Sequence, residues 1–422
     1  MTLKAGFAEV DITPPVGTHK IGWLKDIVSD SILDPLHARI AIFSSGNASV
    51  AFVQLDTLII ARRDVLSIRE AVSRELGFPG CNVLVAATHN HAGPAVDDAG
   101  EVKRDEACAG AIVERVIDAF GRALAGMQEV ELGFEHVYEW NVAFSRRVVM
   151  RDGTVCTHGS FRDSEALFFE GPIDPEVAVL AARAAGGELL GAIVNFACHP
   201  THHGGDPAIS AGYPGALADE LRAAGCPVTL FLNGAAGNMH YADPRGIFPD
   251  RSKEEIGKLL AQDVKLALAK MQFTDSEGLE SRSRTVALPF RPVTQDEVRG
   301  AVHGAQRFID TAIYDRQIPA LLARIAAEGT QRAEVQAITL GPCDFVGVPA
   351  EYFVEHGLRI KTECHPRHAL VVGYANGHIG YVPTRAAFTR GGYETTFGPP
   401  SFLAPEAGDL LADAAIALVR EG

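Results

Sequence analysis

Short apolar segments that each end in a polar stretch recur along this chain. The first, residues 83–87, is followed by Thr-His-Asn-His and then by the turn-forming pair Gly93-Pro94. An uninterrupted apolar run of this length predicts a strand that is buried on both faces. Alternate residues of an extended chain point to the same side, so His89 and His91 are expected to face one cleft at a strand end. A pair of half-buried loop histidines held by hydrogen bonds is equally compatible with this segment alone.

The spacing of apolar residues predicts alternating strands and helices. A strand over 49–60 precedes a helix over 63–76 that ends at Gly77, and the strand 83–87 follows. A helical crossover of this length usually joins parallel strands. Further strands are predicted over 6–15, 40–44, 130–140, a hairpin of 176–182 and 189–197, 228–232, 280–290, 333–340, 343–348 and 368–373, and further helices over 104–127, 215–224, 252–271, 294–327, 352–362 and 404–420. The pattern indicates an α/β protein with central mixed β-sheets flanked by helices.

Composition excludes several classes of partner. The chain has 422 residues, of which 47% are hydrophobic and 22% charged, as is usual for a soluble globular enzyme. Its 38 basic and 53 acidic residues give a net charge of −15, which disfavours nucleic acid and anionic membrane surfaces. No run of about 18 apolar residues predicts a transmembrane segment, and the first residues lack the apolar core of a signal peptide. Seven cysteines without a Cys-x-x-Cys pair predict free thiols in a reducing compartment, so we expect a cytoplasmic protein.

A second group of histidines follows the strand predicted over 189–197. Cys198 and His199 come first, and adjacent residues of a strand point to opposite faces. If His199 faces the cleft, Cys198 faces the core, so the two do not form a nucleophile–base pair. His202 and His203 lie beyond a proline in a polar loop and are expected to be exposed rather than to bind a ligand.

Two charged features need partners if they are buried. Asp56 lies inside a strongly apolar run, where a carboxylate must be paired, hydrogen-bonded or bound to a metal. Most buried aspartates are structural, so Asp56 is only a candidate for supporting a site. The segment 141–171 is polar and predicted to be irregular, with a hairpin turn at 152–153. It contains Arg146 beside a second arginine, and a solvated basic pair is the simplest interpretation of these two residues.

A glycine-containing segment follows the strand predicted over 228–232. Its sequence is Asn-Gly-Ala-Ala-Gly-Asn-Met-His, and Gly234 and Gly237 would let the backbone approach a ligand closely. The segment is neither a Walker loop nor a dinucleotide fingerprint, because it lacks the lysine and the third glycine. The chain also has no Gly-x-Ser-x-Gly elbow.

Two more predicted strands end near residues that can bind a metal. Glu351 follows one of them after a proline, and Tyr381 lies beyond another. Together with His89 and His199, strand ends therefore deliver two imidazoles and a carboxylate, which is the usual ligand set of a catalytic Zn²⁺ ion. The residues alone favour a metal hydrolase over a histidine-lined binding pocket.

Six segments together resemble the catalytic domain of the neutral (alkaline, non-lysosomal) ceramidases. They keep their order and span nearly the whole chain, and the first histidine motif is the most specific. The segments are VDITP (10–14), ATHNHAGP (87–94), FACHPT (196–201), NGAAGN (233–238), VPAE (348–351) and 376–384, which contains Tyr381. The resemblance implies a single ceramidase-like catalytic domain over residues 1–422.

The resemblance implies one Zn²⁺ ion held by four residues. His89 matches the first histidine of the family's THTHSGP motif, and His199 matches the histidine of its second motif; both are zinc ligands in the family. Glu351 looks like the family's carboxylate ligand from a Pro-Gly-Glu stretch, and Tyr381 is similar to its tyrosine ligand. The positions lie far apart along the chain, so their spacing does not test this set.

The resemblance also implies how these residues would cleave an amide. Zinc lowers the pKa of a bound water to about 7 and supplies hydroxide for attack on an amide or ester carbonyl. Tyr381 and Arg146, which resembles the arginine of an Asn-Arg-Ser stretch in the family, are expected to stabilise the oxyanion. His91 matches the second histidine of the motif and is expected to take a proton and pass it to the leaving amine.

The chain departs from the family at several positions. Met239-His240 stands where the family has a serine, so His240 is expected to act as a polar or proton-transferring substitute. We expect Asn238, His240 and Asn376 to contact the substrate. The family's Ser-Asp-Asn stretch appears as Ser-Ala-Gly at 210–212, which removes a polar contact. We expect neither the C-terminal immunoglobulin-like domain of the ceramidases nor their secretion signal.

The leading hypothesis is a zinc-dependent hydrolase that cleaves the C–N bond of an N-acyl substrate, either a small molecule or a lipid-like one. A cytoplasmic protein has little access to ceramide in membranes, so a small soluble N-acyl compound is the preferred substrate class. An esterase or lactonase on the same metal site is one alternative. A non-catalytic homologue that binds a metal or ligand is another, suggested by the missing serine. The acyl group, the amine and the oligomeric state are not predicted by the sequence.

Overall fold

The larger β-sheet is mixed and contains the strands that lead to both histidine motifs. The computed structural model describes residues 2–275 and 278–422. The strand order is β17 (Thr229–Asn233), β15 (Leu189–Phe196), β14 (Glu176–Ala184), β9 (Gln128–Tyr138), β1 (Lys4–Asp11), β5 (His37–Ser45), β6 (Ala48–Leu55) and β7 (Val83–Ala87), with β19 (Phe273–Thr274) beside β9. β15 pairs with β17 in parallel, as β6 does with β7, and the other neighbours are antiparallel. The helix α1 (Arg62–Leu76) connects β6 to β7, which confirms the predicted crossover.

A second sheet packs face to face on the first. Its order is β20 (Leu279–Pro289), β21 (Thr330–Leu340), β22 (Cys343–Gly347) and β24 (His368–Val372). Phe52 of β6 and Phe345 of β22 meet edge to face with ring centroids 4.9 Å apart, within an apolar cluster that draws on both sheets. Burial of these two inner faces removes their apolar side chains from water and holds the sheets together.

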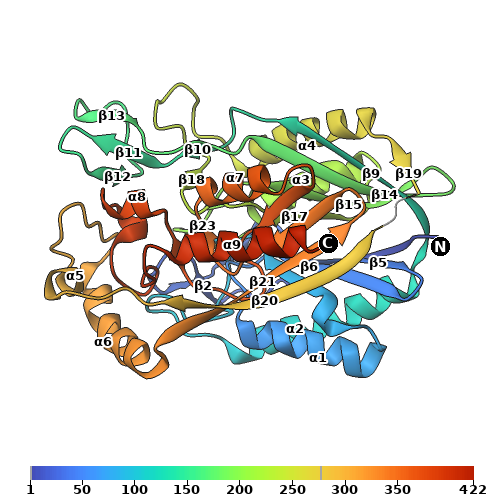
Figure 1. Cartoon of the computed structure of the whole chain (residues 1–422), viewed down its shortest axis with the longest axis horizontal. Coiled ribbons are helices and arrows are strands. Elements are labelled where there is room, and N and C mark those ends of the chain that lie inside the picture. The colour runs from blue at the N-terminus through green and yellow to red at the C-terminus, as the bar shows by residue number, and fades with distance from the viewer. Residues whose placement is uncertain (1, 276–277) are drawn as a thin grey trace.

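Helices cover the outer faces of both sheets (Figure 1). The larger sheet packs against α1, α2 (Glu106–Ala125), α3 (Gly212–Ala223) and α4 (Lys253–Lys270). The second sheet packs against α6 (Thr311–Glu328), α7 (Val354–Glu363) and α9 (Ala407–Arg420). The layers therefore follow the order helix, sheet, sheet, helix, and the predicted α/β class is confirmed. No helix within residues 2–275 and 278–422 combines the length and apolar character that a bilayer span requires.

Short elements connect these layers. They are β2 (His19–Ile21), β3 (Ile27–Val28), β4 (Ser31–Ile32), η1 (Gly80–Asn82), β8 (Gly93–Pro94), β10 (Phe144–Ser145), β11 (Arg147–Met150), β12 (Val155–Thr157), β13 (Ala166–Phe169), β16 (Ala208–Ile209), β18 (Met239–His240), α5 (Gln295–Arg299), β23 (Glu351–Tyr352), β25 (Tyr381–Val382), α8 (Arg385–Phe388) and η2 (Tyr393–Thr395). The segment 141–171, predicted to be irregular, thus contains four short strands. Its hairpin turn at 152–153 lies between β11 and β12, as predicted.

The single helix predicted over 294–327 is wrong. The segment forms two helices, α5 and α6, because Gly300 adopts a φ of 64° and ends the first of them. The second starts after Asp310, whose side chain accepts a hydrogen bond from the backbone of Ala312. Capping residues therefore outweigh the helical spacing of the intervening apolar residues.

Candidate metal centre

Three side-chain atoms converge from three strand ends. Nε2 of His89 lies 3.1 Å from Nε2 of His199, and Oε2 of Glu351 lies 3.3 and 3.2 Å from these two nitrogens. His89 follows β7, His199 follows β15, and Glu351 begins β23. All three side chains are buried. The structure therefore brings together three of the four residues that the sequence suggested as metal ligands, and we call this group with Tyr381 the metal centre.

The hydrogen bonds of the two imidazoles fix where their protons lie. Nδ1 of His89 is 2.8 Å from the carbonyl oxygen of Leu58, and Nδ1 of His199 is 2.7 Å from that of Ala236. A carbonyl only accepts, so each Nδ1 carries the proton and each Nε2 presents a lone pair.

The meeting point of these atoms is suited to a cation. Burial, followed by the charge of Arg146, lowers the pKa of His199 to about 3, which keeps this ring neutral near pH 7. In the described part of the chain no group donates a hydrogen bond to Oε2 of Glu351. Three electron-pair donors that face one another in a buried site repel unless a positive charge lies between them. Two imidazoles and a carboxylate also form a donor set that suits a divalent transition metal.

His91 lies beside this group. Its ring centroid is 4.8 Å from that of His89, and ligand atoms of His89, His91 and His199 all lie within 4.8 Å of one another. Nδ1 of His91 is 2.8 Å from the carbonyl oxygen of Gly22, which leaves Nε2 buried without a partner among the residues described. Burial and the neighbouring imidazoles hold the pKa of His91 well below its usual value, so Nε2 is a neutral acceptor.

Tyr381 lies next to the carboxylate because of strand register. β23 and β25 are parallel, and Glu351 is the direct pairing partner of Tyr381. The hydroxyl of Tyr381 accepts a hydrogen bond from Nη2 of Arg146 at 3.0 Å. Burial raises the pKa of Tyr381 well above its ordinary value, against the effect of the Arg146 charge.

Arg146 is held by several acceptors rather than by water. Its guanidinium donates to Oε1 of Glu394 at 2.8 Å and to the carbonyl oxygen of Gly237 at 2.8 Å, in addition to Tyr381. The neighbouring Arg147 also binds Glu394, at 2.6 Å, and is fully buried. The interpretation of this pair as solvated is therefore wrong. Glu394 pairs with both guanidinium groups and Glu170 pairs with Arg147, so two carboxylates balance the two charges. Glu394 lies 248 residues from Arg146 and left no signal in the local sequence.

The glycine segment supports the carboxylate and does not itself form a ligand cradle. A Cβ atom at Gly237 would lie 2.4 Å from the carbonyl oxygen of Glu351, and one at Gly234 would lie 2.9 Å from the Cβ of Ala197. The predicted close approach of backbone therefore exists, but the approaching group is the chain itself. The absence of a side chain at Gly237 lets β23 reach the imidazoles.

The amides of Asn238 and Asn376 are engaged by the scaffold. Oδ1 of Asn238 accepts from the backbone of Val354 at 2.9 Å, and its Nδ2 donates to Glu355 at 2.9 Å. Oδ1 of Asn376 accepts from the backbone of Val85 at 3.0 Å, and its Nδ2 donates to Gln336 at 2.7 Å and to Glu334 at 3.4 Å. Both side chains therefore have positioning roles in the scaffold, and the substrate contacts expected of them stay a prediction.

His240 is buried close to His199. The two residues form an isolated parallel bridge, and Nε2 of His240 lies 2.7 Å from the hydroxyl of Thr201. Nδ1 accepts from the backbone of Ala242 at 3.0 Å, so Nε2 carries the proton. The ring of His158 meets that of His240 edge to face, with centroids 4.8 Å apart. His158 was not identified from the sequence, because it lies in a turn without a motif.

The predicted environment is correct for Cys198 and wrong for His202. Cys198 faces the core, as predicted, and burial raises the pKa of its thiol far above the usual range. The exposed position expected for His202 is wrong, because its ring stacks on Tyr241 at 4.0 Å and its Nε2 is 3.1 Å from the carbonyl oxygen of Arg251. Tyr241, which is distant in the sequence, covers the ring of His202 and contributes to its burial.

Two other buried groups surround the centre. The ring of Tyr374 stacks on His89 with centroids 4.0 Å apart, a contact that sequence analysis missed although Tyr374 lies just beyond β24. Asp56 is paired with Arg39 at 3.0 Å and accepts from Gln54 at 2.9 Å. Its buried charge is therefore satisfied by protein groups, and its backbone carbonyl accepts a hydrogen bond from Asn90 of the motif at 3.4 Å.

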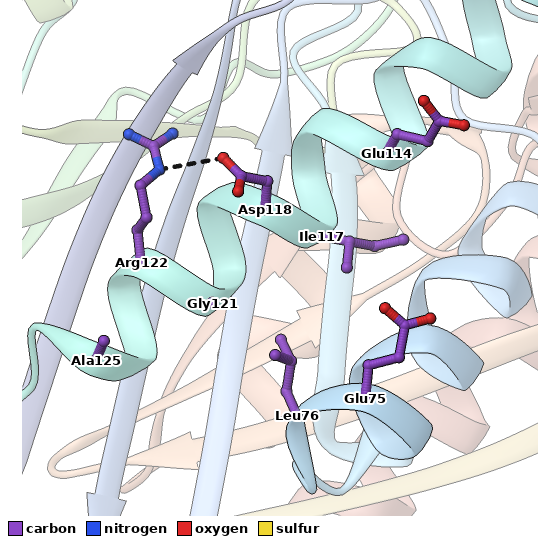
Figure 2. A pocket seen from close by; sticks show the side chains of 8 residues that line it. All are labelled: Glu75, Leu76, Glu114, Ile117, Asp118, Gly121, Arg122 and Ala125. Carbon is purple, nitrogen blue, oxygen red and sulfur yellow. Dashed lines mark ion pairs between the residues drawn. The ribbon is translucent and has the colours of Figure 1, made fainter.

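A separate cavity of about 590 Å³ opens between α1 and α2. Figure 2 shows that its lining comes from the two helices, with the ion pair of Asp118 and Arg122 at 3.4 Å on one wall. None of the residues of the metal centre lines it. A smaller cavity of about 320 Å³ includes Asn376 and His378 in its lining.

Comparisons with known proteins agree with this architecture. No family model matches the chain. The chain is 24% identical over 417 residues to the neutral ceramidase of Pseudomonas aeruginosa, an alignment that covers 81% of this chain and 60% of that protein. The chain thus spans about 60% of the length of this curated relative. The predicted resemblance to neutral ceramidases is confirmed.

Solved structures show the same fold. A crystal structure of neutral ceramidase from Pseudomonas aeruginosa superposes with a TM-score of 0.75 and 22% identity, covering 100% of this chain and 75% of that one. A structure of a ceramidase complexed with C2 gives a TM-score of 0.75 and 21% identity, covering 100% of this chain and 76% of that one. The predicted ceramidase-like architecture is therefore confirmed.

Proposed function

We propose that the chain is a metal-dependent hydrolase that cleaves the amide bond of an N-acyl substrate. The observation that carries this proposal is the convergence of Nε2 of His89, Nε2 of His199 and Oε2 of Glu351, while Nδ1 of each imidazole faces a backbone carbonyl. The similarity to a neutral ceramidase supports the reaction class, because ceramide is an N-acyl amide.

One divalent ion of the zinc type suits this donor set. His89 and His199 supply imidazole nitrogens, Glu351 supplies a carboxylate oxygen, and Tyr381 adds a phenolic oxygen beside them. Nitrogen and oxygen donors of this kind are preferred by zinc, in sites that leave a coordination position open. When bound, such an ion would polarise an acyl carbonyl and lower the pKa of a water molecule.

The chain's own residues can then position and stabilise the reacting groups. Arg146 donates to the hydroxyl of Tyr381 and is fixed by Glu394, so the guanidinium and the phenol are preorganised for negative charge on an acyl oxygen. Nε2 of His91 is available to accept a proton and to return it to the leaving nitrogen. Burial of Arg146, Tyr381 and Glu394 limits the access of bulk water and strengthens their electrostatic effect.

The proposal is tested by metal analysis and a substrate panel. The purified chain is expected to contain a divalent metal and to hydrolyse N-acyl amides of short or long acyl chain more effectively than matched esters and lactones. His199→Gln is expected to lose the metal bound at His89, His199 and Glu351, together with the hydrolysis. Hydrolysis that persists without metal and is unaffected by His199→Gln would refute the metal-dependent reaction. Selective turnover of esters or lactones would assign the other reaction class, and no turnover at all would favour a binding protein.

A cytoplasmic location is proposed on the basis of the cysteines. All seven thiols are free, including those of the exposed Cys81 and the buried Cys198. Free thiols persist in reducing compartments and tend to pair in oxidising ones. Cell fractionation with a disulfide-bonded periplasmic or secreted marker tests this proposal.

A further inference from the structure

A second group of imidazole and carboxylate side chains lies outside the metal centre. His136 on β9 pairs with Ala178 on β14, and Glu176 pairs with Tyr138 two residues further along. Alternate residues share a face of a sheet, so His136 and Glu176 are diagonal neighbours on the same face. His368 is the first residue of β24, which packs on this face from the other sheet. We call His136, Glu176 and His368 the rim cluster, because they lie where the two sheets meet.

The three side chains have the separations of a metal site. Nε2 of His368 is 2.7 Å from Oε1 of Glu176, Nδ1 of His136 is 3.9 Å from the same oxygen, and ligand atoms of all three lie within 4.8 Å of one another. Donors in a tetrahedral zinc site with bonds near 2.0–2.1 Å are about 3.3 Å apart, so the observed distances lie on either side of that value. The side chains of His136 and His368 are 32% and 31% exposed, so an ion can reach them from solvent.

The charges in contact with the rim cluster favour a cation. Oε2 of Glu176 accepts from Lys361 at 2.7 Å, and Lys361 also binds Asp174 at 2.5 Å. A further carboxylate oxygen, on Glu135, lies 3.9 Å from Nδ1 of His136. With neutral imidazoles these three carboxylates exceed the one ammonium group by two charges, which a divalent ion would balance.

The remaining contacts support binding through the stated atoms. The hydroxyl of Tyr138 lies 3.3 Å from Nε2 of His136, so it can orient that ring with Nδ1 toward Glu176. In the absence of an ion, Nε2 of His368 donates its proton to Oε1 of Glu176. Binding requires the neutral ring to carry its proton on Nδ1 instead, a tautomer change that water can mediate without net release of a proton.

We propose that Nδ1 of His136, Oε1 of Glu176 and Nε2 of His368 bind a divalent transition-metal ion of the zinc type. The ion links β9 and β14 of the larger sheet to β24 of the second sheet. Water completes its coordination on the exposed side. This site is structural, since the metal–ligand bonds connect the two β-sheets and none of its residues is assigned to amide hydrolysis.

Zinc stoichiometry of the full chain tests the proposal. The protein is stripped with a chelator, titrated with Zn²⁺ by calorimetry and analysed for bound metal after dialysis. We expect two ions per wild-type chain. His368→Gln retains a hydrogen-bond donor toward Glu176 but replaces the imidazole ligand, so it should bind one ion and keep its amide hydrolysis. His136→Gln should behave in the same way, and it decides the matter if His368→Gln fails to fold.

Two comparisons separate this site from the metal centre. His199→Gln should also bind one ion, but that ion should remain at the rim cluster and be lost in the double variant with His368→Gln. His19→Gln is the matched control, because His19 pairs with Asp26 at 2.6 Å on the surface and belongs to no cluster of metal-binding side chains among the described residues. It should leave two ions bound.

Stability and diffraction give independent readouts. Zinc should raise the melting temperature of His199→Gln and should raise that of the double variant much less. An anomalous zinc signal between the three side chains would locate the ion. Two results together would overturn the proposal. Wild type and His368→Gln would contain equal amounts of zinc, and neither rim variant would bind zinc more than ~10-fold more weakly than wild type. Failure of the metal centre alone would instead leave one ion, sensitive to His368→Gln and insensitive to His199→Gln.

Discussion

The metal centre and the rim cluster use similar side chains but hold them differently. At the metal centre, Nδ1 of each imidazole donates to a backbone carbonyl, as His89 does to Leu58, and the rings are buried. At the rim cluster the rings are about one third exposed, and the proton of His368 lies on the bond to Glu176 itself. Protons are therefore kept away from the meeting point in the first group and occupy it in the second. Imidazole lone pairs that are held in place favour a catalytic role for the metal centre. At the rim cluster the proton of His368 must move before an ion binds, which favours a structural role.

The largest expected effect comes from removing charge at the metal centre. Glu351→Gln keeps the size of the side chain but leaves the imidazoles of His89 and His199 with a neutral partner. We expect loss of the centre's metal and a fall in kcat/KM beyond the ~10–100-fold typical of residues that only support a ligand. Steady-state kinetics and elemental analysis measure both, with Glu135→Gln at the rim as the comparison. An equal effect of the two substitutions would remove the distinction between the clusters.

At the rim, Lys361→Met is expected to act on stability rather than on catalysis. Burial lowers the pKa of Lys361, but Asp174 and Glu176 outweigh this and raise it, so the ammonium is charged. Its loss leaves two carboxylates without their counter-ion, which should cost about 3 kcal/mol in zinc-free urea unfolding.

Zinc should recover part of this loss, because the ion supplies the missing positive charge. Lys265→Met, on the exposed face of α4, should change the unfolding free energy by less than about 0.5 kcal/mol. Similar unfolding free energies for the two lysine variants would show that the buried charges at the rim need no compensation.

Arg146→Lys tests preorganisation at the metal centre. Lysine can still pair with Glu394 but cannot also donate to Tyr381 and Gly237 with the geometry of the guanidinium. We expect kcat to fall by roughly 10²-fold with zinc content unchanged. Arg147 binds the same glutamate, Glu394, but has no contact with Tyr381 among the described residues. Arg147→Lys should therefore retain kcat per folded molecule. If zinc is lost together with activity, Arg146 acts on the metal site itself.

The smallest effect concerns the carboxylate pair Asp263 and Glu139, for which no described cation contributes to the pKa shift of Asp263, in contrast to the rim. Burial, together with the charge and hydrogen bond of Glu139, raises the pKa of Asp263 to about 7. Protonation then stabilises the fold fully below the unfolded pKa, and this contribution is lost as pH rises through about 7.

Asp263→Asn should therefore be more stable than wild type by on the order of 1 kcal/mol at pH 8, after allowance for partial exposure, and the difference should shrink toward pH 4. Urea unfolding at both pH values measures it, and Glu139→Gln should reproduce it. A difference that does not vary with pH would show that the two carboxylates do not share a proton.

The sequence was most informative where a local pattern determines the structure. The apolar runs before His89 and His199 correctly predicted buried strands, because burial on both faces requires continuous apolar side chains. The convergence of His89 and His91 was predicted from an extended chain, yet His89 has a φ of 69° and lies beyond the end of β7. The turn brings the two rings together in a way that alternation of residues does not describe.

Features that depend on distant partners were not predictable. Arg146 is buried because Glu394 and Tyr381 reach it from segments more than 200 residues away. The amide of Asn376 is taken by Gln336 and Val85, which no local motif indicates. The rim cluster has no local sequence signal either, since it joins strands from two different sheets. Such contacts arise from the packing of layers, and no local sequence pattern indicates which residues meet.

The bare backbone at Gly237 has a consequence for how this protein can vary. One added methyl group there would press on the carbonyl of Glu351 from 2.4 Å and push the carboxylate away from the histidines. Gly237→Ala changes neither charge nor polarity, yet it is expected to displace Glu351 and abolish metal binding at the centre. Which substitutions the metal centre tolerates therefore depends on the absence of a side chain at Gly237 as well as on the side chains that face the centre.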